Sequence, residues 1–215
     1  MMPLILRLKK ETHRNIARAQ DTIVNEIFSV FEEAALHGGT AIWRCYNGNR
    51  FSEDIDVYIK RDLDRINLLF NKLEKKGFVI VKRKIGRNSL FSTLQFNRTL
   101  VRFEALFKKA NGILAEYTTA EGNLITVSTL TPENLIHEKI DAYLTRFKIR
   151  DLYDIFFLLR DVKDKTPVRS KINSFLKNFK APVDEKELKV LILEGLVPDT
   201  RKMIDYIRQW ERKNI

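Results

Sequence analysis

The stretch LHGGTAIWRCYNGNRFSEDIDVYIK, residues 36–60, decides the fold. The glycine pair Gly38-Gly39 allows a tight turn and a close approach of the backbone to a ligand, and residues 40–46 are predicted to form a short helix directly after it. Further along, acidic or aromatic side chains alternate with aliphatic ones, which is the period of a half-buried strand. Asp54 and Asp56 are therefore predicted to project from one face of that strand.

This combination of glycines and carboxylates indicates phosphate and metal chemistry. Glycine amides at a helix N-terminus can hold phosphate oxygens, because no side chain blocks the approach. Carboxylates at positions i and i+2 of a strand can share one or two Mg²⁺ ions, which bridge a triphosphate and polarise an attacking hydroxyl. Glu104 is a candidate third ligand, since it lies on the predicted strand 100–107, where a carboxylate among apolar residues is costly unless a cation meets it.

The positive charge of the chain is concentrated in one region. The sequence has 39 Lys and Arg against 28 Asp and Glu, a net charge of +11. In residues 72–109 the acidic residues are Glu74 and Glu104, among many basic ones. Such a region favours a polyphosphate partner such as RNA and repels cationic small molecules, although a solvated lysine-rich surface is the alternative interpretation. The RNA-binding candidates are Lys82, Arg83, Lys84 and Arg87.

Composition places the chain in a broad class. With 215 residues, of which 44% are hydrophobic and 31% charged, it can bury a core without cross-links. Its one cysteine, Cys45, forms no internal disulfide. We expect a cytoplasmic protein without membrane contact, because no apolar run approaches the roughly 18 residues of a membrane span and the N-terminus lacks the features of a signal peptide.

Hydrophobic periodicity predicts an α+β fold in two parts. Residues 1–130 are predicted to form a mixed β-sheet flanked by helices, and residues 131–215 a helical bundle that begins at the N-cap Thr131. Predicted helices cover 14–35, 62–76, 131–144, 150–162, 168–179, 185–194 and 200–212. Predicted strands cover 78–84, 90–96, 99–107, 113–117 and 124–127, in addition to the strand that contains Asp56.

The first motif resembles that of a known enzyme family. Residues 36–60 look like the core motif of the DNA polymerase β-like nucleotidyltransferase superfamily, in the variant of AbiEii-type (MenT-like) toxins. There a Gly-Gly-Thr-Ala start leads into Arg-x-Ser-x-Asp-x-Asp. The matching residues here are Gly38, Gly39, Thr40, Ala41, Arg50, Ser52, Asp54 and Asp56.

A second motif resembles the same toxins. HEKIDAYLTRFKIRDLYDIFFLL, residues 137–159, is similar to their Lys-containing helix and their Arg-Asp-x-x-Asp helix. Spacing places Asp151 and Asp154 on one helix face and predicts that Arg150 pairs with Asp154, a polar set that can orient Lys139 near a triphosphate. The alternative is a salt-bridge network that pins the helices together.

The resemblance implies a nucleotidyltransferase-type sheet and a Mg²⁺-dependent enzyme, with Mn²⁺ as a substitute. It would move a nucleoside monophosphate from an NTP to a hydroxyl of an RNA such as tRNA, as the toxin of a toxin–antitoxin system with a cognate antitoxin. Alternatives are transfer to a small molecule or a protein, and a catalytically silent nucleotide-binding or RNA-binding module. The implied catalytic set is Asp54, Asp56, Lys139 and Asp154; the NTP-binding set is Gly38, Gly39, Thr40, Arg50, Ser52, Lys139, Arg150 and Asp151; the metal set is Asp54, Asp56 and Glu104.

Overall fold

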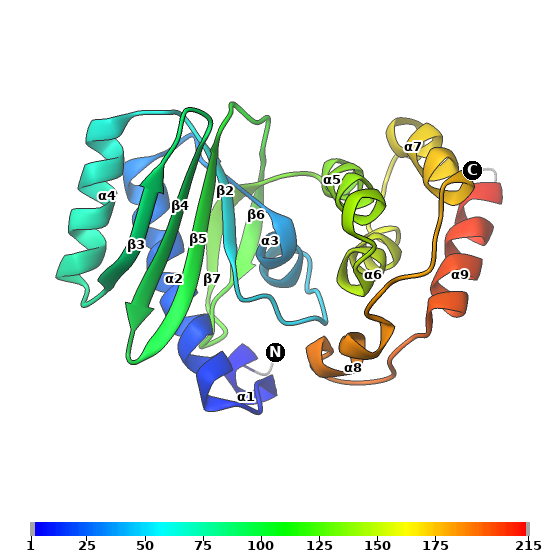
Figure 1. Cartoon of the computed structure of the whole chain (residues 1–215), viewed down its shortest axis with the longest axis horizontal. Coiled ribbons are helices and arrows are strands. Elements are labelled where there is room, and N and C mark those ends of the chain that lie inside the picture. Colours follow the sequence, from blue (N-terminus) through cyan, green and yellow to red (C-terminus); the bar gives the residue numbers. More distant parts are fainter. Residues whose placement is uncertain (1–2, 214–215) are drawn as a thin grey trace. The chain divides into compact units, whose positions relative to one another are not determined.

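The computed structural model describes residues 3–213 (Figure 1). Their contacts divide the chain into two compact units. Unit 1 contains the described residues as far as Asn47 together with Ser52–Leu130. Unit 2 contains Gly48–Phe51 together with the described residues from Thr131 onward.

Unit 1 is built on a mixed sheet of seven strands within the described residues. The strand order is β3-β4-β5-β2-β1-β7-β6, in which β2 runs parallel to β5 and β1 parallel to β7, and the other neighbours are antiparallel. The strands are β1 (Ala35–His37), β2 (Ile55–Ile59), β3 (Val79–Ile85), β4 (Ser89–Phe96), β5 (Thr99–Phe107), β6 (Ile113–Thr118) and β7 (Leu124–Thr129).

Helices cover one face of the β5 region of this sheet and leave the other face open. Along β5, Val101, Phe103 and Ala105 are buried, whereas Arg102 and Glu104, which alternate with them, are exposed. The buried side chains lie against α2 (Glu11–Val30) and α4 (Leu63–Lys75), which pack on each other (Figure 1). This strict alternation, with period two, gives the sheet one apolar and one polar face.

Local sequence signals explain both ends of α4. The Asp62 carboxylate accepts a hydrogen bond from the backbone N of Arg65 at the start of α4, and Gly77 follows its end with a φ of +90°. The predicted helix 14–35 extends too far, because Ala35 pairs with Tyr58 in the sheet instead of continuing α2. Two shorter helices complete the unit, α1 (Leu4–Arg7) and α3 (Gly38–Cys45).

Unit 2 is helical. Thr131 caps its first helix through the backbone N of Asn134, as the sequence predicts, and Tyr143 packs against the rings of Phe175 and Phe179 in the core. Gly48–Phe51 joins this unit although it lies within residues 1–130. The helices are α5 (Pro132–Arg146), α6 (Ile149–Leu158), α7 (Thr166–Lys177), the 3₁₀ helix η1 (Glu185–Glu187), α8 (Leu188–Leu191) and α9 (Thr200–Arg212). The predicted class, a mixed sheet with flanking helices followed by a helical bundle, is confirmed.

Candidate active site

The glycine turn lies against the strand carboxylates. Gly38 joins β1 to α3 with a φ of +70°, a conformation that favours glycine. A Cβ atom on Gly38 would lie 2.2 Å from Oδ2 of Asp56. Both the backbone conformation and the close approach therefore require glycine at this position.

Three carboxylates gather where β2 and β5 run side by side on the open face. Asp56 and Glu104 are register partners, and partners on neighbouring strands lie about 4.8 Å apart. Asp54 precedes β2, and its carboxylate accepts hydrogen bonds from Nε and Nη2 of Arg102 at 2.6 and 2.9 Å. Partial desolvation, then the negative charges of Asp56 and Asp54, raise the pKa of Glu104. The electrostatic potential at this point of the sheet face is therefore negative.

This donor set suits a hard divalent cation, which prefers carboxylate oxygens. The three side chains lie near one another without converging on one point: within residues 3–213 no group of three or more His, Cys, Asp or Glu is arranged so that it could already hold a metal ion. The Asp54 carboxylate is held by Arg102. Asp54 would have to exchange Arg102 for the cation. Glu104 lies on the exposed face of the largely apolar strand β5, where its partial desolvation and the negative charges of Asp56 and Asp54 both favour a cation.

Thr40 and Ser52 support the start of β2 from within unit 1. The Thr40 hydroxyl donates a hydrogen bond to the backbone O of Asp54. The Gln20 side-chain amide donates to the backbone O of Ser52 at 2.9 Å and to the Thr40 hydroxyl at 3.5 Å. These contacts connect α2 and α3 to the backbone of residues 52–54, which positions the Asp54 carboxylate.

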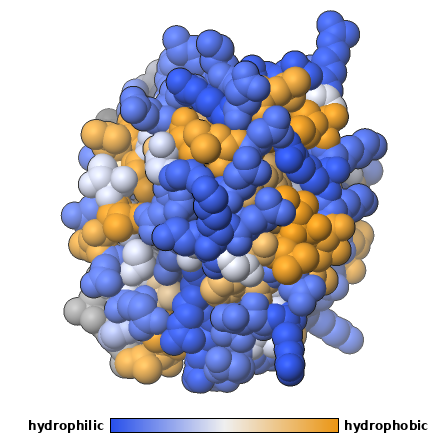
Figure 2. Space-filling view, turned by 90° about the vertical axis from the view of Figure 1, so that its left-hand side faces the viewer, coloured by the Kyte–Doolittle hydropathy of each residue, from blue (hydrophilic) through white to orange (hydrophobic). Residues whose placement is uncertain are grey.

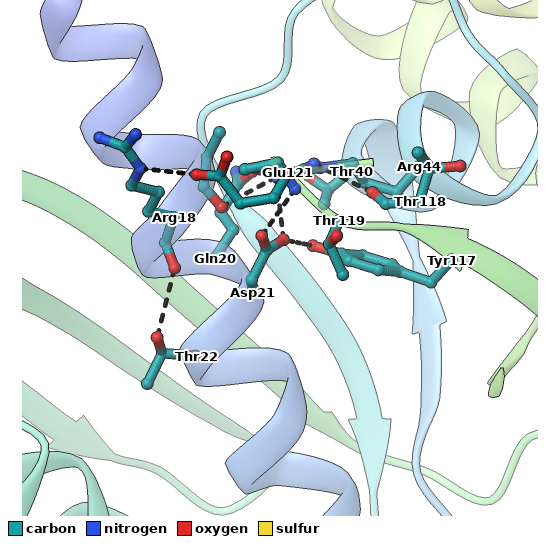
Figure 3. A network of polar contacts seen from close by, with 12 residues as sticks. Arg18, Gln20, Asp21, Thr22, Thr40, Arg44, Tyr117, Thr118, Thr119 and Glu121 are labelled. Atoms are coloured by element: carbon teal, nitrogen blue, oxygen red, sulfur yellow. Dashed lines mark hydrogen bonds and ion pairs between the residues drawn. The ribbon is translucent and has the colours of Figure 1, made fainter. Parts of the chain in front are cut away.

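A buried ionic network that the sequence did not reveal joins α2, α3 and β6 (Figure 3). The fully buried Arg44 pairs with Asp21 at 3.2 Å and donates to the backbone O of Ala17 and of Thr118. Asp21 also accepts a hydrogen bond from the Tyr117 hydroxyl. Burial raises the pKa of Asp21, and the charge of Arg44 opposes that shift. A single arginine in the apolar run AIWRC was the available sequence signal.

Unit 2 holds a second charged cluster. Arg50 donates from Nε and Nη2 to the Asp154 carboxylate at 2.8 and 2.7 Å. Nζ of Lys139 lies 2.7 Å from Asp154 and 3.6 Å from Asp151, whose carboxylate also binds Arg146 at 2.7 Å. Burial opposes the ionisation of Asp154, but Arg50 and Lys139 outweigh it and hold its pKa below the usual value.

One predicted pairing in this cluster is wrong. Asp151 and Asp154 share a helix face, as expected, because both contact Lys139. Arg150 does not pair with Asp154; the partner is Arg50, distant in sequence. A local pair at positions i and i+4 is worth only about 0.2–0.5 kcal/mol, so a buried two-point contact from Arg50 outcompetes it.

The RNA-binding candidates divide between two faces of β3. Lys82 and Lys84 are exposed, and Lys84 lies in one cross-strand row with Phe91 of β4, Glu104 of β5 and Asp56 of β2. Figure 2 shows that hydrophilic side chains, with apolar patches between them, cover the α4 and β3 side of the molecule.

Arg83 points the other way. It donates to the Asn67 side chain at 2.6 Å and covers the Phe70 ring at 4.3 Å, so its contacts are to α4. Arg87 lies in the turn between β3 and β4.

None of the helices in the described part of the chain is long and apolar enough to cross a membrane.

A glycine turn facing paired strand carboxylates on an open sheet defines a nucleotidyltransferase class of enzyme. The sequence model of the family described as "Nucleotidyl transferase AbiEii toxin, Type IV TA system" matches residues 25–209. The chain belongs to this family of nucleotidyltransferase toxins from toxin–antitoxin systems. No curated protein sequence matches the chain.

Solved structures share this fold at low sequence identity. MenT4, a nucleotidyltransferase toxin from Mycobacterium tuberculosis, is 16% identical with a TM-score of 0.63, covering 92% of this chain and 82% of its own. JHP933 from Helicobacter pylori is 17% identical with a TM-score of 0.64, covering 94% and 91%. A putative nucleotidyltransferase from H. pylori is 18% identical with a TM-score of 0.64, covering 94% of both chains.

Proposed function

We propose that this enzyme transfers a nucleoside monophosphate from an NTP to a hydroxyl of RNA, with tRNA as the acceptor, and acts as a toxin in the cytoplasm. The observation that carries the proposal is the contact geometry of Gly38 with Asp56, next to Glu104, on the open sheet face that also presents Lys82 and Lys84. A cognate antitoxin is the partner that would restrain the activity.

The metal set comprises Asp54, Asp56 and Glu104. A bound Mg²⁺, or Mn²⁺ in its place, would neutralise phosphate charge and polarise the attacking hydroxyl. Arg102 holds Asp54 through a half-exposed ion pair that is worth no more than about 1 kcal/mol. A divalent cation held by these carboxylates would therefore displace Arg102 at little cost, and the guanidinium would then be available to a phosphate.

The glycine turn binds phosphate oxygens. The backbone amides of Gly38 and Gly39 open α3, where the helix dipole favours negative charge. Thr40, a predicted NTP contact, holds the backbone of Asp54 through its hydroxyl, and Ser52, another, is held through its own backbone carbonyl by Gln20. Their contribution is positional, because both are buried.

The NTP-binding set that the family resemblance implies also includes cations of unit 2. Lys139 supplies a compact positive charge for phosphate oxygens, and Asp151 and Asp154 orient its ammonium group. The charge of Arg50 is largely offset by Asp154. Arg150 makes no ion pair in the described part of the chain and is the cation of this set that is most available to a phosphate.

RNA suits the open face better than a cationic small molecule does. Lys82 and Lys84 lie three strands from Asp56, or roughly 14 Å at about 4.8 Å per strand. A backbone lying across the strands could contact both lysines while its terminal hydroxyl reaches the carboxylates. An aminoglycoside-like polycation would be repelled by the same lysines.

The test is label transfer from each of the four α-labelled NTPs in Mg²⁺, with total tRNA, a purified protein and an aminoglycoside as competing acceptors. We expect label in the tRNA band for at least one NTP. Label on the protein or on the aminoglycoside alone would show that this molecule, and not tRNA, is the acceptor. NTP binding without any transfer would favour a catalytically silent binding module.

A further inference from the structure

A cavity of about 350 Å³ opens in unit 1 at the carboxyl ends of β2 and β5. Lys60 and Arg61, which follow β2, and Lys108 and Lys109, which follow β5, contribute to its lining. The last residues of the two strands are register partners, so both pairs of cations leave the sheet side by side. In open α/β sheets, ligands commonly bind outside the carboxyl ends of parallel strands.

The cavity has an unbalanced positive charge. None of its four cations makes an ion pair with any residue in the described ranges 3–213. The carboxylate in its lining belongs to Glu33, which is already held by Arg65 at 3.3 Å. An anionic ligand would therefore meet four cations that have no internal counterion.

One wall of the cavity is apolar. Phe107 and Ala110 line it, and the guanidinium of Arg61 lies 5.9 Å from the centroid of the Phe107 ring. Nζ of Lys108 similarly lies 5.0 Å from the Tyr58 ring. Cationic groups combined with an aromatic platform are typical of sites for single-stranded nucleic acid, in which the cations hold phosphate and the ring packs against a base.

The cationic surface continues beyond the cavity. The backbone N of Phe107 donates to the backbone O of Asn88 at 2.9 Å, which places the β3–β4 turn, with Arg87, beside the cavity. Arg61 lies five positions after Asp56, two residues beyond the end of β2, which corresponds to at most roughly 16 Å of extended chain at about 3.3 Å per residue. The cavity is thus separate from the carboxylate site, yet an RNA strand of several nucleotides could reach both.

We propose that this cavity binds one nucleotide unit of the RNA acceptor, upstream of the reacting hydroxyl. The phosphate contacts Lys60, Lys108 and Lys109, and the base or ribose packs against Phe107 beneath Arg61. This inference rests on the proposed function for the RNA acceptor, but it requires neither the metal nor the chemical step.

The experiment measures, by fluorescence anisotropy, the binding of a labelled single-stranded RNA in EDTA and without NTP. The RNA has about 12 nucleotides, which is within the range of site sizes of proteins that bind single-stranded nucleic acid. The variants are Lys108→Gln with Lys109→Gln, which removes two cations, and Ala110→Phe, which fills the apolar part without a charge change. The control is Lys177→Gln with Lys189→Gln, an equal charge change at exposed positions of unit 2.

We expect about tenfold weaker binding in both cavity variants, and a salt slope that falls by about 0.7 per lost phosphate contact in the lysine variant. The control should bind like the wild type. A direct titration with adenosine monophosphate distinguishes the source of the phosphate. If the cavity variants weaken binding of the free nucleotide but leave RNA binding unchanged, the cavity takes a free nucleotide instead of an RNA unit, and the proposal is overturned.

Wild-type RNA affinity in both cavity variants would also overturn it. This failure differs from failure of the proposed function, because label transfer by the same variants is measured separately. Intact transfer with unchanged RNA binding would reject the cavity alone. Absence of transfer in the wild type, with RNA binding that still depends on the cavity, would reject the proposed chemistry alone.

Discussion

The two charged clusters of this enzyme are built in opposite ways. In unit 1, Asp54, Asp56 and Glu104 lie on an open sheet face, and their negative charge is only partly balanced by the half-exposed Arg102. In unit 2, Asp154 is buried and receives two-point hydrogen bonds from Arg50 as well as the Lys139 ammonium group. The first arrangement leaves carboxylate oxygens available to a cation, whereas in the second both buried carboxylates already have cationic partners within the protein. Substitutions in the two clusters should therefore affect different properties.

The largest expected effect in unit 1 comes from Gly38→Ala. The new Cβ would lie 2.2 Å from Oδ2 of Asp56, so the carboxylate must move, and a displacement of about 1 Å can cost roughly 10²-fold in rate. Steady-state label transfer measures the loss. Gly77→Ala is the matched control, because Gly77 also has positive φ but no atom lies within 4 Å of its added Cβ. Equal transfer by the two variants would show that the contact with Asp56 is irrelevant.

Asp154→Asn should cause the largest loss of stability. It leaves Arg50 and Lys139 without their shared buried counter-charge, and such a loss typically costs about 3–5 kcal/mol. Asp54→Asn breaks a half-exposed pair and should cost no more than about 1 kcal/mol. Urea unfolding followed by circular dichroism compares the two free energies of unfolding. Similar costs would contradict the contrast between the clusters.

The sequence predicted the fold and the exposed carboxylates of unit 1 better than it predicted the buried ion pairs. The alternation of polar and aliphatic residues was enough to predict Asp54 and Asp56. The strand patterns on either side of Asn97-Arg98 were enough to predict the hairpin, and both of these turn residues have the positive φ that a tight connection requires. The partner of Asp154 could not be read in this way. The local rule offers Arg150, whereas the structure brings Arg50 from a loop more than 100 residues away.

Three other features could not be predicted for the same reason, because they also depend on contacts between residues that are distant in sequence. The Arg102–Asp54 pair depends on the parallel register of β2 and β5, and the Arg44–Asp21 pair depends on the packing of α2 against α3. The cations of the cavity belong to two strand exits that are far apart in sequence. Long-range register and packing decide these contacts, so periodicity and motif spacing do not contain them.

A smaller effect is expected for RNA binding on the two faces of β3. Lys82→Gln with Lys84→Gln removes cations from the open face and should reduce the salt slope of RNA binding by about 0.7 per lost contact. Arg83→Gln should leave the slope unchanged, because its guanidinium contacts Asn67 and Phe70. Anisotropy titrations at several salt concentrations give both slopes. A larger change for Arg83→Gln would mean that RNA binds on the α4 side.

The smallest effect concerns acid stability. The pKa of Asp154 is lowered in the folded protein, so its ionisation contributes stability above the unfolded value of roughly 3.9, and this contribution is lost as pH falls through the lower folded pKa. The wild type should lose more stability than Asp154→Asn as the pH falls below about 4. Urea midpoints across that range test the difference. Parallel curves for the two proteins would show that Asp154 is not stabilised as an anion.

The central claim is that the open carboxylates of unit 1 perform the transfer to RNA. The direct measurement is transfer of α-labelled NMP to tRNA by wild type and Asp56→Asn, with thermal unfolding of the same preparations. We predict labelled tRNA with the wild type, background labelling with Asp56→Asn, and equal unfolding midpoints, because Asp56 lies on the partly exposed face of β2. Undiminished labelling by a folded Asp56→Asn protein would contradict the account.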